Sequence, residues 1–320
     1  ATEDDSTKPK RTALGDITNL SSRASNKPEK SRTKSGKNKV DPVNSAIDEN
    51  LEAAAISSGS EEQRERSDYD ALIFQYLHSL ELDPKRRPLS DYMEKIQKDL
   101  NPSMRTVLID WLVEVAEEYK LVSDTLYLAV SYIDRFLSTR SLIRKDLQLL
   151  GVTCMLIAAK YEESNPPKVE EFCYITDNTY TKEEVVNMER NVLKLLDFQV
   201  GNPTVETFMR FVSASDDLFF FFSQASKLKH ECLCRYIAEL SLLDYGCVAY
   251  IPSLIAASAI FLARSTLRPD IHPWTLSLQK KTGYEAREMG ECIKRLHDLQ
   301  RGNGRNERAI EQKYMDHKVR

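Results

Sequence analysis

The sequence predicts an all-α fold: two tandem five-helix units, preceded by a single helix and a disordered N-terminal arm. No stretch of any length alternates apolar and polar residues as a half-buried strand does, whereas apolar residues recur at helical spacing from about residue 67 onward. Two segments, 147–162 and 251–264, are apolar on nearly every side, which is typical of the central helix of a bundle. Aligning Lys160 with Arg264 gives an offset of 104 residues between them. The chain is therefore predicted to contain an internal repeat.

The arm, residues 1–65, is nearly free of aromatic residues and rich in Ser, Thr, Lys, Asn and Asp, so it cannot bury enough surface to fold alone. Between Lys8 and Lys39 it holds ten Lys or Arg against two acidic residues. Since the net charge of the whole chain is −4, the remainder is strongly acidic. A basic arm on an acidic body is typical of solvated disorder, of a nuclear-import signal or of nucleic-acid contact. The chain begins at Ala1 instead of Met, which predicts processing or truncation at this end.

Residues 66–100 are predicted to form one helix and a linker. Tyr69, Ile73, Tyr76 and Leu77 recur at helical spacing, and the charged stretch 83–88 follows as the linker. A lone helix of this length is marginal in water. It must therefore dock on another part of the chain or on a partner.

The first unit is predicted over residues 101–198. It begins at Asn101-Pro102, an N-cap residue followed by proline at the first helical position. Its later helices are expected at 123–138, at 147–162, at 169–174 and after the capping box of Thr181 and Glu184. The second unit is predicted over residues 199–302 and begins in the same way at Asn202-Pro203. The helices expected there and in the tail, residues 303–320, are 217–244, 251–264, 285–299 and a short one at 307–316.

The first helix of the first unit, residues 104–120, has a wider apolar surface than one core needs. Its apolar residues cover roughly 240° of the helix, although a core-facing side normally covers little more than ~100°. They form two stripes: Ile109, Leu112, Val113 and Ala116 in one, and Met104, Val107, Leu108, Trp111 and Val115 in the other. One stripe can serve the unit's own core. The other is either buried by the second unit or exposed for a partner.

Composition argues against an enzyme, a metalloprotein and a membrane protein. The sequence has no Walker loop, no G-x-G-x-x-G and no zinc-protease motif, so no cofactor is expected. The six cysteines mostly lie in apolar helical patterns and are predicted to be reduced core thiols. Cys232 and Cys234 follow His230 and Glu231, but residues two apart on a helix do not face each other, and no zinc site is expected. No apolar run of 18 residues and no signal peptide occur, which predicts a soluble protein.

Two motifs relate the chain to a known family. Residues 104–112 read Met-Arg-Thr-Val-Leu-Ile-Asp-Trp-Leu, and with a leading helix and two five-helix units they resemble the box of the cyclins. The resemblance covers about residues 68–316, and the stretches 112–120, 174–180, 238–243 and 252–258 are similar to A-type cyclins, plant members in particular. In the arm, the spacing of four residues resembles a destruction box, the degron read by the anaphase-promoting ubiquitin ligase: Arg11, Leu14, Ile17 and Asn19.

The cyclin family keeps five positions in its first box, and this sequence matches them with Arg105, Asp134, Leu149, Lys160 and Glu189. Arg105 projects within the Ile109 stripe, and a buried guanidinium needs a carboxylate, so Arg105 and Asp134 are predicted to form an internal scaffold pair. The resemblance implies that Lys160 and Glu189 contact a cyclin-dependent kinase around its C-helix. Local pairing within the chain, Lys160 with Glu163 for example, is the alternative. Apolar contact to the kinase is expected from Ile157, Tyr161, Tyr69, Ile73 and Tyr76.

The resemblance also implies a docking patch for R-x-L peptides of substrates and inhibitors. Its apolar residues would receive the peptide's leucine, and Glu114 its arginine. The second stripe is then expected to be exposed, and burial against the second unit is the alternative. The patch consists of Met104, Val107, Leu108, Trp111, Glu114, Leu147 and Gln148.

The function implied by the resemblance is that of a non-catalytic regulatory subunit. It would form a heterodimer with a cyclin-dependent serine/threonine kinase, activate it and recruit R-x-L substrates. It would thereby control S-phase and mitotic progression, and it would be degraded through the destruction box by the ubiquitin pathway. A nuclear location with cytoplasmic presence is expected. The rival is a nucleic-acid-binding factor built from paired cyclin folds. That class needs a basic face on the folded repeats, whereas the body here is acidic, so nucleic acid is not an expected partner.

Overall fold

The computed structural model describes residues 69–213, 224–302 and 309–317, all within the unit Gly59–Arg320. Within these ranges every regular element is helical and no strand is present, which confirms the predicted all-α class. None of the described helices is long and apolar enough to cross a membrane. The destruction-box residues Arg11, Leu14, Ile17 and Asn19, with the rest of the predicted arm, lie outside the described residues.

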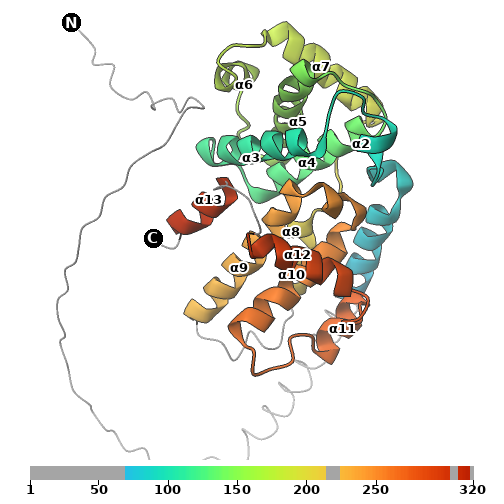
Figure 1. The fold of residues 1–320 in the computed structure, drawn as a ribbon, viewed down its shortest axis with the longest axis vertical. Helices are drawn as coiled ribbons and strands as arrows, with labels where there is room; N and C mark the ends of the chain where they lie inside the picture. The colour runs from blue at the N-terminus through green and yellow to red at the C-terminus, as the bar shows by residue number, and fades with distance from the viewer. Residues whose placement is uncertain (1–68, 214–223, 303–308, 318–320) are drawn as a thin grey trace, which may run out of the picture. The chain divides into compact units, whose positions relative to one another are not determined.

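The first unit packs four helices around α5 (Figure 1). Every residue of α5 from Leu149 to Ala159 is buried, so its apolar circumference is used in full. The side chain of Asn101 accepts a hydrogen bond from the Met104 amide at 3.0 Å and caps α3 as predicted. The elements are α3 (Pro102–Glu118), α4 (Ser123–Leu137), η2 (Arg144–Asp146), α5 (Leu147–Glu162), α6 (Val169–Ile175) and α7 (Lys182–Leu195).

The second unit repeats this plan around α10, which packs against α8, α9 and α12 (Figure 1). Like α5, α10 is 16 residues long and buried along most of its length. This correspondence confirms the internal repeat predicted from the sequence. The elements are α8 (Val205–Ser213), α9 (Gln224–Leu243), η4 (Tyr245–Ala249), α10 (Pro252–Leu267), α11 (Leu276–Thr282) and α12 (Gly290–Gln300).

Two predicted helix starts in the second unit are wrong. Helix α8 begins at Val205 and is not capped by Asn202. The Asn202 side chain instead accepts a hydrogen bond from Arg86 Nη1 at 2.9 Å and donates one to the Arg86 carbonyl at 3.2 Å. Helix α12 begins at Gly290 instead of near residue 285, because residues 286–289 form turns. Helix α11 was not predicted.

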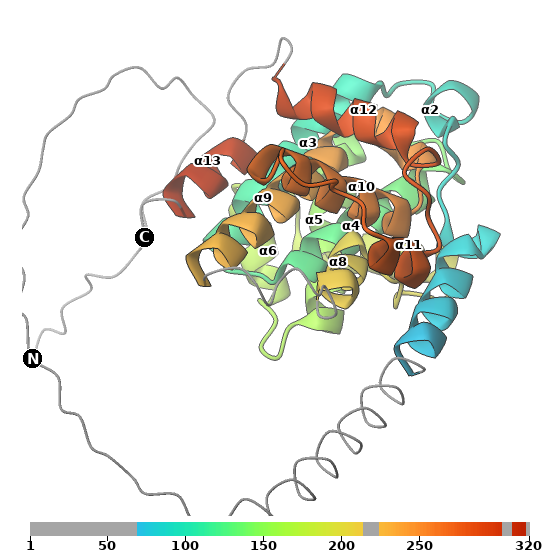
Figure 2. The same cartoon turned by 90° about the horizontal axis from the view of Figure 1, so that it is seen from below.

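The leading helix, residues 69–82, is present as predicted, and the linker after it contains η1 (Pro84–Arg86) and α2 (Tyr92–Lys95). Although this helix precedes the first unit in the sequence, it lies beside the second one, near α8 and α11 (Figures 1 and 2). Its buried Phe74 packs against Phe208 and Phe211 of the second unit, with ring centroids 5.7 and 5.5 Å away. The leading helix therefore docks within its own chain.

Helix α3 has a third face that the apolar pattern does not reveal. Besides the core stripe and the stripe that includes Val107, a row of polar residues faces the second unit and α13 (Ala309–His317). Thr106 Oγ1 donates to the Leu243 carbonyl at 2.8 Å, and Asp110 Oδ1 accepts from the Ala309 amide at 3.1 Å. Glu117 forms an ion pair with Lys313 of α13 at 3.2 Å. Helix α3 thus joins both units and the C-terminal helix.

Candidate functional site

The predicted scaffold pair of Arg105 and Asp134 is present and buried, with Arg105 only 2% exposed. Arg105 Nε and Nη2 each donate to one oxygen of the Asp134 carboxylate at 2.7 Å, which is a bidentate arrangement. The third donor, Nη1, reaches the Leu242 carbonyl of α9 at 2.8 Å. The pair therefore also ties the first unit to the second, which the sequence did not reveal.

The hydroxyl of Tyr92 in α2 completes this network by donating to Asp134 Oδ1 at 2.8 Å. Burial and the nearby Asp134 charge raise the pKa of Tyr92, so it stays a neutral donor. With four hydrogen bonds directed at or from the pair, neither charge is left unpaired in the interior. Removing one partner of such a buried pair typically costs about 3–5 kcal/mol.

Lys160 at the end of α5 and Glu189 on α7 are bonded to each other, with Nζ and Oε1 at 2.6 Å. The Lys160 side chain is 48% exposed and that of Glu189 is 16% exposed. Lys160 therefore pairs locally, as the alternative held, but its partner is Glu189 and not Glu163, whose Oε1 accepts from the Val122 amide and from Thr125 Oγ1. The structure thus brings the two charged residues predicted for kinase contact together at one surface.

The apolar residues predicted around this pair divide into two groups. Tyr161 is 53% exposed, whereas Ile157 is only 4% exposed and belongs to the core. The expectation of a surface contact through Ile157 is therefore wrong, because α5 is central and buried from Leu149 to Ala159. On the leading helix, Tyr69, Ile73 and Tyr76 are all exposed as separate large side chains.

One exposed residue near this surface was missed. Phe198, just after α7, is 67% exposed, and both it and Asp197 adopt positive φ angles of 56° and 52°. Such angles are uncommon for residues with a side chain and impose backbone strain. Three residues further on, Gly201 lies against the Tyr161 hydroxyl, where a Cβ would clash. The sequence offered no signal, since an aromatic residue after an amphipathic helix is typical of a core position.

The predicted docking patch is exposed only in part. Val107, at 65%, and Glu114 are exposed, and the side chains of Met104, Trp111 and Gln148 are half-buried. The expectation that the stripe is exposed is wrong for Leu108 and Val115, which are buried, and Leu147 of the patch, on α5, is buried as well. Leu108 packs directly on Gly151 of α5, where no Cβ intervenes. The buried leucines therefore form the floor beneath a narrower exposed surface.

Glu114 lies at the edge of the docking patch next to the face occupied by α13. Partial burial and the neighbouring Asp110 charge raise the pKa of its carboxyl. Asp110 and Glu117 already bond to Ala309 and Lys313 of α13. Glu114 is exposed and lies three residues after Trp111 on α3, so the two side chains are neighbours on the helix surface.

Two family models match consecutive parts of the chain that correspond to the two helical units. The model of the cyclin N-terminal domain matches residues 72–201, and that of the cyclin C-terminal domain matches residues 203–320. The chain belongs to the cyclin family. Cyclins are non-catalytic regulatory subunits of cyclin-dependent kinases, and this chain is such a subunit rather than an enzyme.

Similar cyclins come from plants and belong to the A type. The chain is 51% identical to the putative cyclin-A3-1 of Arabidopsis thaliana over 314 residues, which covers 97% of this chain and 85% of that protein. It is 56% identical over 256 residues to cyclin-A3-1 of Oryza sativa subsp. japonica, covering 79% and 67% of the two chains. The fold matches the X-ray structure of a viral cyclin from herpesvirus saimiri, with a TM-score of 0.60 and 21% identity, over 71% and 96% of the chains.

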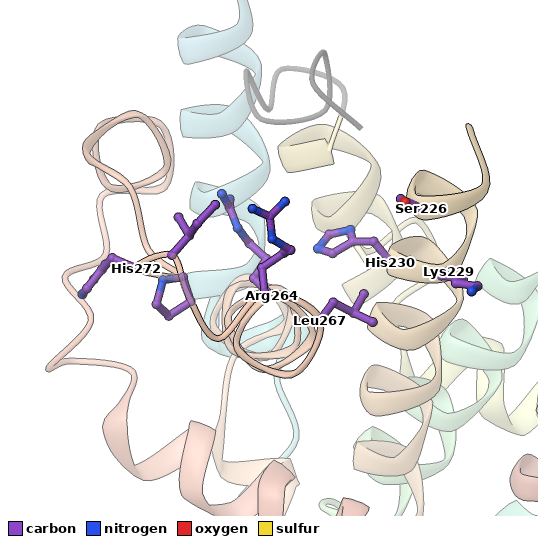
Figure 3. Close-up of a pocket in the computed structure, with 9 residues that line it drawn as sticks. Ser226, Lys229, His230, Arg264, Leu267 and His272 are labelled. Carbon is purple, nitrogen blue, oxygen red and sulfur yellow. The ribbon is translucent and has the colours of Figure 1, made fainter. Parts of the chain in front are cut away.

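The second cyclin fold does not repeat the surface ion pair of the first. At the offset of 104 residues, Arg264 stands in the place of Lys160, but Ile293 stands in that of Glu189. Arg264 is buried, and its side chain points toward His230 across a cavity of about 170 Å³ (Figure 3). Burial and the Arg264 charge lower the pKa of His230 to about 4. The exposed charge pair is therefore a property of the first fold.

The cysteines of this cyclin lie mainly in the core. Cys154, Cys173, Cys234, Cys247 and Cys292 are buried, and Cys232 is half-buried. Cys234 Sγ contacts the ring of His230 at 3.7 Å, one helical turn away. Among the described residues, no group of three or more His, Cys, Asp or Glu is arranged to hold a metal ion.

Proposed function

We propose that this cyclin binds and activates a cyclin-dependent serine/threonine kinase through one composite surface. It consists of the Lys160–Glu189 pair, the exposed aromatic residues Tyr161 and Phe198, and the outer row of the leading helix, which is formed by Tyr69, Leu72, Ile73 and Tyr76. The single observation that carries the assignment is the exposed Lys160–Glu189 bond, because it presents a donor and an acceptor within 2.6 Å of each other at the end of an otherwise apolar helix. Cyclins of this kind rotate the kinase C-helix so that the catalytic Lys–Glu pair forms.

A closed ion pair suits this role physically. In the free cyclin the two charges satisfy each other, so the surface has no unpaired buried charge. On binding, Lys160 keeps further donors and Glu189 further acceptor positions for groups of the kinase. Desolvation by a surrounding apolar partner strengthens each such bond, which concentrates binding energy at the centre of the interface.

The docking patch supports a second part of the proposal, the recruitment of R-x-L substrates and inhibitors. Val107 and Trp111 offer an apolar surface above the floor of Leu108 and Leu147 for a leucine side chain. Glu114 stands at its edge as a carboxylate partner for an arginine. An exposed apolar surface with one acid at its rim fits a short basic and apolar peptide.

The third part of the proposal concerns timing and place. The residues Arg11, Leu14, Ile17 and Asn19 act as a destruction box for the anaphase-promoting ubiquitin ligase and limit the protein's lifetime around mitosis. The basic arm directs the cyclin to the nucleus, with part remaining in the cytoplasm. Kinase activation by this cyclin then serves S-phase and mitotic progression.

The kinase assignment is tested with the double variant Lys160→Ala and Glu189→Ala. Purified from dividing plant cells, the parent chain is expected to carry a bound kinase with histone-phosphorylating activity. The double variant is expected to lose both, because the centre of the interface is removed. Far-UV circular dichroism checks that the helical fold is retained.

A matched control is available on α7, the helix that carries Glu189. Lys182 of α7 forms a similar exposed ion pair with Glu170 of α6, at 2.7 Å. The variant Lys182→Ala with Glu170→Ala removes the same two charges and is expected to keep the kinase. If the Lys160 and Glu189 variant retains full kinase activity, the assignment is wrong.

A further inference from the structure

The leading helix is held on the second cyclin fold by a short inward row of side chains. Phe74 packs on α8, His78 stacks on Phe74 with ring centroids 5.8 Å apart, and Glu81 is only 4% exposed. The opposite row is open to solvent, with exposed fractions of 48–67% for Tyr69, Leu72, Ile73 and Tyr76. The orientation of this outer row therefore depends on the few contacts that the inward row makes with the second cyclin fold.

Glu81 lies at the N-terminus of α10. The N-cap residue of α10 is Ile251, whose side chain has no group to accept a hydrogen bond. Glu81 takes that place from outside the helix, since its Oε2 accepts from the Ser253 amide at 2.9 Å. A carboxylate at a helix N-terminus is also favoured by the helix dipole.

The other oxygen of Glu81 is used as well. Its Oε1 accepts from Ser253 Oγ and contacts His78 Nδ1 at 2.6 Å. Ser253 Oγ in turn lies 2.6 Å from the Tyr284 hydroxyl, which follows α11. These contacts connect the leading helix to α10 and to the loop before α12, and they fix the position of the leading helix relative to both.

The cost of burying the Glu81 carboxylate restricts the position of the leading helix on α10. Burial raises the pKa of Glu81, whereas the hydrogen bonds from Ser253 and His78 lower it. A buried carboxylate without its partners is costly, so a displaced leading helix would forfeit several bonds at once.

We infer that Glu81 is a positioning residue for kinase binding: by capping α10 it fixes the leading helix so that Tyr69, Ile73 and Tyr76 project toward the kinase. This inference rests on the proposed function, in which the outer row contacts the kinase. It assigns to the second cyclin fold a part in kinase binding that needs no contact between that fold and the kinase. Two chain segments 172 residues apart are coupled in this way.

The first test measures the affinity of Glu81 variants for the kinase that co-purifies with the parent chain. Glu81→Ala is expected to raise the dissociation constant about ten- to a hundredfold, and Glu81→Gln, which keeps one acceptor oxygen, by less. Hydrogen exchange of the amides 74–82 should accelerate while that of α5 stays unchanged. The control Gln75→Ala, at an exposed position of the same helix, should change neither quantity.

The second test separates positioning from general destabilisation. In the triple variant Tyr69→Ala, Ile73→Ala and Tyr76→Ala, the three side chains that Glu81 is inferred to position are absent. Adding Glu81→Ala to this background is expected to leave kinase affinity unchanged. A further loss of affinity there, or an unchanged affinity of both Glu81 single variants in the parent background, would overturn the inference.

The outcomes also distinguish the inference from the proposal beneath it. If the triple variant alone keeps the parent affinity, the outer row does not contact the kinase, and that part of the proposed function fails together with the inference. If the triple variant binds weakly but both Glu81 variants bind normally, only the inference fails. Should Glu81→Ala not fold, Glu81→Gln gives the same comparison.

Discussion

At the level of single residues, Trp111 and Glu114 lie where the packing of α3 meets the docking patch proposed for R-x-L peptides. Trp111 is half-buried, so part of its indole packs on the core while the rest contributes to the docking patch. Glu114 contributes only at the rim. Their effects on docking and on stability are therefore separable by substitution.

Substituting Trp111 by Ala is expected to lower kcat/KM for R-x-L substrates about tenfold or more, because a central aromatic contact is lost. Phosphorylation of a short peptide without the motif should stay at the parent level. Glu114→Gln keeps the fold and removes only the rim charge, so a smaller loss limited to R-x-L substrates is expected. Equal effects on both kinds of substrate would contradict the docking role, and unfolding of Trp111→Ala alone would make Trp111 a core residue.

His230 predicts a specific dependence of stability on pH. Its pKa is about 4 in the folded chain against roughly 6.5 when unfolded, so between these values the unfolded state binds more protons. Stability therefore falls as the pH decreases from 6.5 toward 4. Between pH 7 and pH 5 the free energy of unfolding should drop by about 2 kcal/mol more in the parent than in His230→Gln.

Urea unfolding at the two pH values measures this difference. The variant His297→Gln is the control, because His297 is exposed and should leave the parent's pH dependence intact. An identical pH dependence of the parent and His230→Gln would show that His230 is accessible to protons in the folded state.

At the scale of elements, the two Asn-Pro dipeptides show what the sequence can and cannot predict. Asn101 caps α3 as expected, whereas Asn202 bonds to Arg86, about a hundred residues earlier in the chain, and leaves α8 to begin at Val205. An N-cap is predicted from neighbouring residues alone. The Asn202 side chain is instead bound by Arg86, a tertiary partner that neighbouring residues do not reveal. The amphipathic helices α4 and α7 and the wholly apolar helix α5 agree with prediction to within a residue or two.

The sequence predicted those parts of the candidate site that belong to a recognisable motif. The Arg105–Asp134 pair followed from a guanidinium on a core stripe. Burial depth did not follow, since Ile157 and Leu108 are apolar at helical spacing like their exposed neighbours and differ only in what packs over them. Phe198 and Glu81 escaped prediction because their roles depend on a strained turn and on a distant helix end.

The destruction box is an element whose test is independent of the fold. Arg11→Ala with Leu14→Ala is expected to lengthen the half-life of the protein in extracts from cells leaving mitosis several-fold, because the recognition peptide loses its base and one aliphatic. Pulse-chase labelling measures the half-life. Leu20→Ala with Arg23→Ala removes the same residue types outside the motif and should change nothing; equal half-lives for parent and motif variant would exclude the degron.

At the scale of the whole molecule, the two cyclin folds share a polar junction. Arg105 and Thr106 donate to the carbonyls of Leu242 and Leu243, and Lys313 of α13 forms ion pairs with Glu117 and Glu239 from the two folds. Separating the folds would leave these groups without partners, including a carboxylate that is 1% exposed. The folds should therefore lose their structure together.

The chain's two tryptophans, Trp111 and Trp274, report on one fold each. In the variants Trp111→Phe and Trp274→Phe, the remaining tryptophan's fluorescence is expected to change at the same urea concentration as the far-UV circular dichroism of that variant. Comparing probes within one variant removes any effect of the substitution on stability. Two separated transitions would show that the junction does not couple the folds.

The three faces of α3 restrict which substitutions this helix can accept during evolution. A residue on an ordinary surface helix packs against one neighbouring element and can be substituted when that neighbour changes. The 17 residues of α3 contact the core of the first fold and the second fold with α13, and they also carry the proposed docking surface. Few substitutions satisfy all three at once, so α3 leaves evolution little freedom, and new specificity is expected to arise at its rim, around Val107 and Glu114, before anywhere else on this helix.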